Sequence, residues 1–156
     1  MNDNRRKVLK GTGGMAIMGL AGSAGLFTPG MASAQTWNKA AFETKNLADT
    51  VKALGGGAPT ESKDIVISSP DIAENGAVVP FTVSSRLAKT ESIALLVEKN
   101  PNALAASFDI PAGTEAGVTT RVKMGQTSNV TALVKADGKY YYTTKEVKVT
   151  IGGCGG

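Results

Sequence analysis

The chain has 156 residues with a formal net charge of +4, and it contains one cysteine and no histidine. This length suits one small domain, and the composition excludes the usual histidine general base, histidine-containing zinc sites and the Cys–His nucleophile pair. Four of the 17 basic residues and one of the 13 acidic residues lie among the first ten positions, which leaves a net charge of +1 on the rest. No cluster of lysine and arginine remains that predicts nucleic-acid binding.

Residues 1–34 have the pattern of an export signal. The pair Arg5-Arg6 opens a charged segment, a weakly apolar stretch runs from Met15 to Phe27, and Ala32-Ser33-Ala34 follows. The paired arginines favour a twin-arginine signal over an ordinary secretory signal, which is the alternative. The apolar stretch is too short and too mild to span a bilayer. We therefore expect a periplasmic protein that is cleaved after Ala34.

Between Trp37 and Leu54 the apolar residues recur at spacings of three and four, which predicts one amphipathic helix. The run Gly55-Gly56-Gly57 and then Pro59 end this pattern. We expect the helix to pack on the domain core rather than on a membrane or a partner. Its apolar face comprises Trp37, Ala40, Ala41, Leu47, Val51 and Leu54.

After Lys63 apolar residues alternate with polar ones, which is typical of half-buried β-strands. Asp137-Gly138 predicts a tight hairpin turn. Because no helical pattern separates the strands, residues 35–151 are predicted to form a mostly β, immunoglobulin-like antiparallel β-sandwich with an N-terminal helix. The expected strands are Ile65–Ile67, Val78–Ser84, Ser92–Glu98, Val118–Met124, Asn129–Lys135 and Tyr140–Ile151.

Two other runs receive structural interpretations. Alternate rings of Tyr140-Tyr141-Tyr142 face opposite sides of a strand, so we expect core packing on one side and an edge or partner contact on the other. The run Asn100-Pro101-Asn102 predicts a turn. Neither run indicates a catalytic site.

The cysteine lies in the run Gly152-Gly153-Cys154-Gly155-Gly156. Glycine has no Cβ, so Gly152, Gly153, Gly155 and Gly156 predict a thin, flexible arm with one functional side chain. Cys154 has no second cysteine with which to form an internal disulfide. From Ile151 an extended backbone reaches Cys154 over about 10 Å, which is enough to enter a narrow enzyme cleft. We predict that Cys154 is a site of covalent substrate attachment.

Taken together, these features resemble the SoxY family, the carrier subunits of the periplasmic sulfur-oxidation (Sox) system. The resemblance covers nearly all of the chain, and it departs from the family only in the leader, at Asn4 and Val8. Its most specific element is the run from Val147 through the Gly-Gly-Cys-Gly-Gly arm. Supporting segments are Val97–Asn102, Phe108, Arg121–Gly125 and the twin-arginine leader.

The resemblance implies a non-catalytic carrier that forms a heterodimer with SoxZ and holds inorganic sulfur compounds covalently. It implies that the cytochrome SoxXA couples thiosulfate oxidatively to Cys154 as a thiosulfonate. SoxB would then hydrolyse sulfate from it and leave a persulfide, and SoxCD, where present, would oxidise the remaining sulfur. The carrier would need no cofactor or metal, and its mature form would bind no nucleic acid or membrane.

Two other interpretations of the last residues stay open. A secreted structural domain that dimerises through an intermolecular Cys154 disulfide explains the lone cysteine but not the surrounding glycines. A ubiquitin-like sulfur carrier would use the Gly155-Gly156 carboxylate as a thiocarboxylate. Its activation requires ATP, which the periplasm lacks, so the leader disfavours it.

Overall fold

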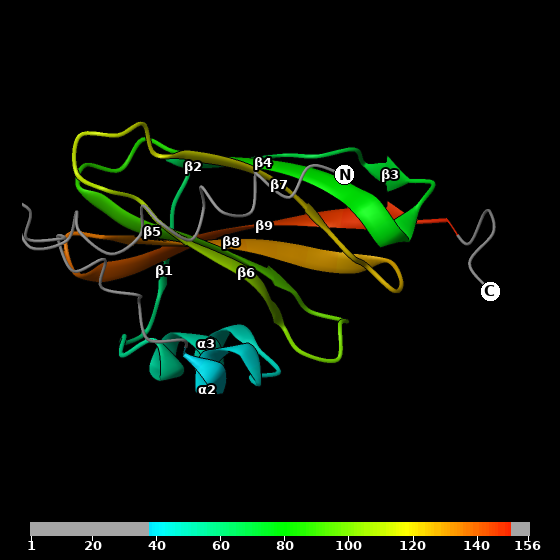
Figure 1. Cartoon of the computed structure of the whole chain (residues 1–156), viewed down its shortest axis with the longest axis horizontal. Helices are drawn as coiled ribbons and strands as arrows, with labels where there is room; N and C mark the ends of the chain where they lie inside the picture. The colour runs from blue at the N-terminus through cyan, green and yellow to red at the C-terminus, as the bar shows by residue number, and fades with distance from the viewer. Residues whose placement is uncertain (1–37, 151–156) are drawn as a thin grey trace, which may run out of the picture. The chain divides into compact units, whose positions relative to one another are not determined.

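In the computed structural model, which describes residues 38–150, two β-sheets pack face to face (Figure 1). The larger sheet has the order β1-β9-β8-β5-β6 with β3 also paired to β9, and the smaller sheet has the order β2-β4-β7. The larger sheet contains β1 (Thr60–Glu61), β3 (Ile72–Ala73), β5 (Thr90–Val97), β6 (Leu104–Asp109), β8 (Ser128–Ala136) and β9 (Lys139–Val149). The smaller contains β2 (Ile65–Ser68), β4 (Val79–Ser85) and β7 (Gly117–Val122), and the 3-10 helix η1 (Gly76–Val78) precedes β4.

The space between the sheets is filled by alternate residues of the strands. Side chains of β4, among them Phe81, pack against those of β5 and β8, because the pleat turns every second residue toward the facing sheet. Phe81, Ile93, Leu95 and Val130 are at most 1% exposed. This arrangement confirms the immunoglobulin-like β-sandwich that the alternation predicts.

The pairings of the longer strands are antiparallel, but β1 and β3 run parallel to β9. These two strands have only two residues each, which is too short to show alternation. The pattern also does not predict strand β6, because Ala105 and Ala106 blur its alternation. The sequence therefore predicts the central strands but not the edges of the larger sheet.

Two short helices, α2 (Lys39–Phe42) and α3 (Leu47–Ala53), replace the single helix predicted from Trp37 to Leu54. The helical pattern breaks before Asn46, whose extended backbone and side chain cap α3 by accepting a hydrogen bond from the N–H of Asp49 (2.9 Å). No helix among residues 38–150 is long and apolar enough to cross a bilayer. Trp37 lies outside the described residues.

The helices cover the face of the larger sheet that points away from the smaller sheet. Ala41 and Val51 are at most 1% exposed and pack on Leu96 and Leu133, as the prediction of core packing requires. Tyr140 and Tyr142 join this cluster, whereas Tyr141 packs on the core between the sheets. The tyrosine run is thus packed on both sides within this chain, and an edge or partner contact is not needed to explain it.

The predicted hairpin turn joins β8 to β9, with Ala136 paired to Lys139. Asp137 and Gly138 both have positive φ angles, 48° and 73°, as a two-residue type I′ turn requires. Lys89 forms an ion pair with Asp137 (2.9 Å), which lowers the pKa of the Asp137 carboxyl through the hydrogen bond and the positive charge of Lys89. The turn brings the two longest described strands into register.

We predict that Gly138→Ala lowers the free energy of unfolding by about 1 kcal/mol. Alanine is strained at positive φ, and this cost exceeds the stabilisation that alanine gives by reducing the freedom of the unfolded chain. Urea denaturation followed by circular dichroism measures this difference. Gly57→Ala is the control, since Gly57 has an ordinary φ and open space at its Cβ position. Equal stability of the two variants would show that the turn does not need its glycine.

Candidate functional site

The predicted attachment site, Cys154 with Gly152, Gly153, Gly155 and Gly156, lies outside the described residues, as do residues 1–34 and the proposed cleavage site. The described chain ends at Thr150, directly after β9. Three residues lie between Thr150 and Cys154, so the Cα atoms of Thr150 and Cys154 are four steps and at most about 14 Å apart at full extension. The base of the predicted arm is therefore placed by the residues around Thr150.

We define the arm root as the segment 148–150 together with Asp71, Ala73 and Thr127, which bind its backbone. The antiparallel pairing of β8 with β9 ends at Ser128 and Val147, so segment 148–150 extends beyond it. On the opposite side, β3 pairs in parallel with Lys148 and Val149. At the arm root, β9 is thus no longer paired with β8 but is paired with β3.

Strand β3 and Asp71, the residue before it, supply backbone acceptors to two residues of the arm root. The N–H of Lys148 donates to the carbonyl of Asp71 (2.9 Å), and the N–H of Thr150 donates to the carbonyl of Ala73 (3.1 Å). The two bonds hold the chain extended up to its last described residue.

A side chain supplies the acceptor on the β8 side. The N–H of Val149 donates to the hydroxyl oxygen of Thr127 (3.0 Å), one residue before β8 begins. The hydroxyl takes the place of the carbonyl that a longer β8 would provide. All three backbone N–H groups of segment 148–150 are therefore hydrogen-bonded.

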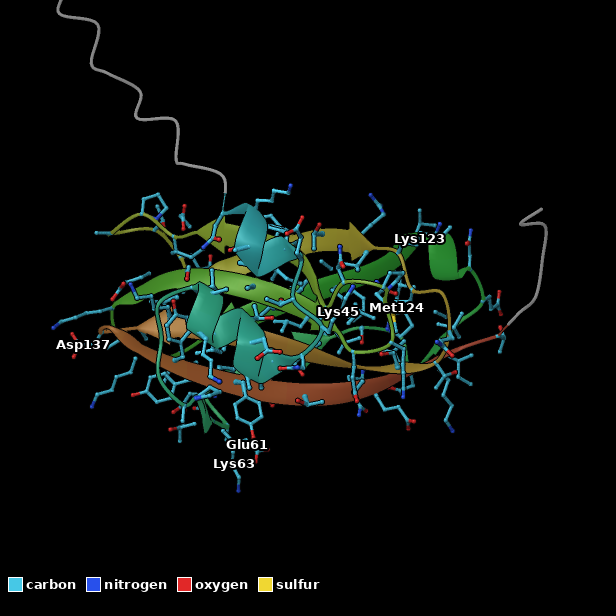
Figure 2. The ribbon with its side chains drawn as sticks, turned by 90° about the horizontal axis from the view of Figure 1, so that it is seen from below. Lys45, Glu61, Lys63, Lys123, Met124 and Asp137 are labelled. Carbon is cyan, nitrogen blue, oxygen red and sulfur yellow. The ribbon has the colours of Figure 1, made fainter. Side chains whose placement is uncertain are left out.

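Asn100 holds the β7–β8 loop that carries Thr127. Its side-chain amide donates to the carbonyl of Lys123 (2.7 Å) and accepts a long hydrogen bond from the N–H of Gly125 (3.5 Å). Figure 2 shows Lys123 and Met124 at the end of the sandwich where β9 ends, with Asp137 at the opposite end. The segments 97–102 and 121–125, which carry part of the family resemblance, therefore meet beside the arm root.

Gly76 allows η1 to approach the arm root closely. The N–H of Met124 donates to the Gly76 carbonyl (2.7 Å). A Cβ atom at Gly76 would lie 2.3 Å from the Met124 carbonyl oxygen and 2.9 Å from Cγ1 of Val149. Only glycine fits here without displacing one of these neighbours.

Lys145 ties the connection between β2 and β3 to β9. Its ammonium group donates to the carbonyl of Ser69 (2.7 Å) and to the carboxylate of Asp71 (2.9 Å). The hydrogen bond and the positive charge of Lys145 lower the pKa of the exposed Asp71 carboxyl. The ion pair lies directly before β3 and helps to keep this strand beside β9.

Two surface hollows among the described residues have no arm-root residue in their lining. One of about 510 Å³, lined by residues that include Leu87, Glu91 and Pro111, lies toward the hairpin end. Another of about 370 Å³ lies between α3 and the sheet and includes Glu98 and Asn129. Within residues 38–150, no group of three or more His, Cys, Asp or Glu side chains is placed to hold a metal ion. The arm root can position a tether, and among the described residues its side chains include no histidine, no cysteine and no metal-binding cluster.

Sequence reasoning predicted the arm, which stays a prediction, and it missed Thr127, Gly76 and the bridging role of Asn100. Each acts through a contact with a segment distant in the sequence, so local pattern carries no signal for it. Asn100 was correctly placed in a turn, and the segments around Asn100 and Gly125 were singled out by resemblance alone.

Two comparisons with known proteins point to the same family. The model of the family described as "Sulfur oxidation protein SoxY" matches residues 51–154, a range that includes Cys154. The sulfur carrier protein SoxY from Chlorobium limicola f thiosulfatophilum is 38% identical, with a TM-score of 0.58 over 66% of this chain and 96% of that one. A superoxide reductase (neelaredoxin) from Ignicoccus hospitalis is 18% identical, with a TM-score of 0.50 over 55% of this chain and 80% of that one, and shares only the fold. No curated protein matches significantly.

We predict that Gly76→Ala lowers the free energy of unfolding by about 1–3 kcal/mol, because the added methyl group forces η1 away from Met124 and Val149. Urea denaturation of the purified chain measures the loss. Gly125→Ala, in the adjacent loop, has nothing within 4 Å of its Cβ position and should change stability by less than about 0.5 kcal/mol. A Gly76 variant as stable as the Gly125 variant would contradict the close packing of η1.

Proposed function

The chain belongs to the SoxY family of sulfur oxidation proteins, and on that premise we propose that it carries intermediates of thiosulfate oxidation as covalent adducts of Cys154. The observation that carries the proposal is the family match, which extends to Cys154 and so includes the first three residues of the predicted arm. The Chlorobium relative is a sulfur carrier protein. The described residues support a carrier rather than an enzyme through the geometry of the arm root.

In the proposed reaction, the thiol sulfur of Cys154 forms a disulfide bond with the outer sulfur of thiosulfate. The thiol proton and two electrons leave, and the electrons pass to a c-type cytochrome of the SoxXA kind. Water then cleaves the bond between the sulfane sulfur and the sulfonate, which releases sulfate and leaves a persulfide on Cys154. Both steps are catalysed by partner enzymes, and the carrier supplies only the attachment point.

The contribution of the carrier is to present the cysteine. Hydrogen bonds hold β9 and the following residue in place up to Thr150, after which three residues lead to Cys154. A short tether that extends from a hydrogen-bonded strand end keeps the adduct at a high local concentration near an enzyme that has docked on the domain. Glycines on both sides of Cys154 add no side chains that would obstruct a narrow active site.

We propose a periplasmic location and a heterodimer with SoxZ. The paired Arg5-Arg6 supports export by the twin-arginine route, with cleavage after Ala34. Because that route moves folded proteins, a partner without its own signal would be exported with this chain. SoxXA, SoxB and, where present, SoxCD would be transient partners at the arm.

The first test is the intact mass of the exported protein from cells grown on thiosulfate, measured before and after treatment with reductant. We expect added sulfur or thiosulfonate that reductant removes and that is absent from Cys154→Ser. A mass that never changes, or a disulfide-linked dimer alone, would contradict the carrier role. The dimer would support the structural alternative.

We predict that Gly153→Val and Gly155→Val reduce thiosulfate-dependent turnover by about tenfold or more without changing the unfolding midpoint. A branched side chain beside Cys154 obstructs entry into an active site, and small displacements of a reacting atom have large effects on rate. Oxygen consumption with the reconstituted partner enzymes measures turnover. Gly57→Val, at an open position in the folded domain, is the control. Normal turnover in both arm variants would count against a glycine requirement at the arm.

A further inference from the structure

We infer that Thr127 is a positioning residue that fixes the point from which the arm extends. Its hydroxyl oxygen accepts the N–H of Val149 and thereby holds the backbone beyond the end of the β8–β9 pairing. The inference rests on the proposed function, because it concerns how the domain presents Cys154.

The pairing around β9 shows why one hydroxyl matters. Past Val147, strand β8 supplies no further ladder partner, and only the two-residue strand β3 pairs with Lys148 and Val149. A strand end held from one side by so short a neighbour opens easily, since few hydrogen bonds must break. Thr127 supplies a hydrogen bond from the other side, so the end of β9 is hydrogen-bonded on both of its edges.

Thr127 is itself held by the loop that precedes it. The Asn100 side chain bonds to Lys123 and Gly125, and Met124 is 2% exposed and bonded to Gly76. Directly after Thr127, the buried Ser128 accepts the N–H of Lys99 (3.0 Å). The hydroxyl is therefore presented from a loop that is fixed on both sides.

The expected consequence of losing this bond is a longer tether. If the chain opens back to Val147, the link to Cys154 grows from four Cα–Cα steps to seven, and its maximal reach grows from about 14 Å to about 25 Å. Effective concentration falls roughly as the −3/2 power of tether length, which corresponds to about a twofold decrease in the fully open state. Opening itself should become about threefold to tenfold more frequent, as expected for the loss of one hydrogen bond.

The first measurement is amide hydrogen exchange, residue by residue by NMR, on the exported chain. The N–H of Thr150 is the reporter, because it donates to the carbonyl of Ala73, whereas the Thr127 hydroxyl accepts from Val149. We expect Thr127→Val to speed its exchange about threefold to tenfold and Thr127→Ser to restore the wild-type rate. The control is Thr131→Val, which removes an exposed hydroxyl pair with Thr144 (3.0 Å) in the middle of the same strand pair.

A functional measurement follows on the same variants. In Thr127→Val, the rate at which the partner cytochrome attaches thiosulfate to Cys154 should fall by up to about twofold, while alkylation by iodoacetamide stays unchanged. The rate of alkylation by a small reagent does not depend on the point at which the tether starts. Unchanged exchange at Thr150 in Thr127→Val, or equal acceleration in Thr131→Val, would overturn the inference. Thiosulfate attachment that survives Cys154→Ser would instead refute the proposed function and leave the exchange result intact.

Discussion

The structure depends on the backbone hydrogen bonding of β9. This strand pairs with β8 along nearly its whole length, with β1 near its start and with β3 at its end. Alternate side chains of the same strand close two cores, since Tyr141 and Val147 face the smaller sheet while Tyr140 and Tyr142 face the helices. Sheet, sandwich and helical layer thus share one strand, and the predicted arm continues directly from it.

Much of the fold could be predicted because its physical causes are local. Alternation identified the longer strands, and Asp137-Gly138 identified the turn between β8 and β9. The prediction failed where local pattern was weak, at the alanines of β6 and at the two-residue strands β1 and β3. It also failed at Asn46, whose capping of α3 competes with the continuous helix that apolar spacing alone suggests.

The site divides in the same way. Cys154 stands out from sequence alone, because a single cysteine among four glycines has no ordinary packing role. The contacts around the arm root could not be predicted, since Thr127, Gly76 and Asn100 act only through neighbours that the fold brings together. Family resemblance marked the segments around Asn100 and Gly125 without explaining them. The hydrogen bonds of Asn100 to the β7–β8 loop provide that explanation.

The parallel pairing of β1 and β3 with β9 has a consequence for the order of folding. Thr60 pairs with Tyr141 and Ala73 with Val149, so this edge of the larger sheet joins segments that are far apart in the chain. Such long-range contacts are slow to form, and these need a strand that leaves the ribosome long after its partners. The edge therefore closes only after synthesis has reached β9. In any molecule whose larger sheet is complete, β9 has therefore already formed, and β9 is the strand that leads to Cys154.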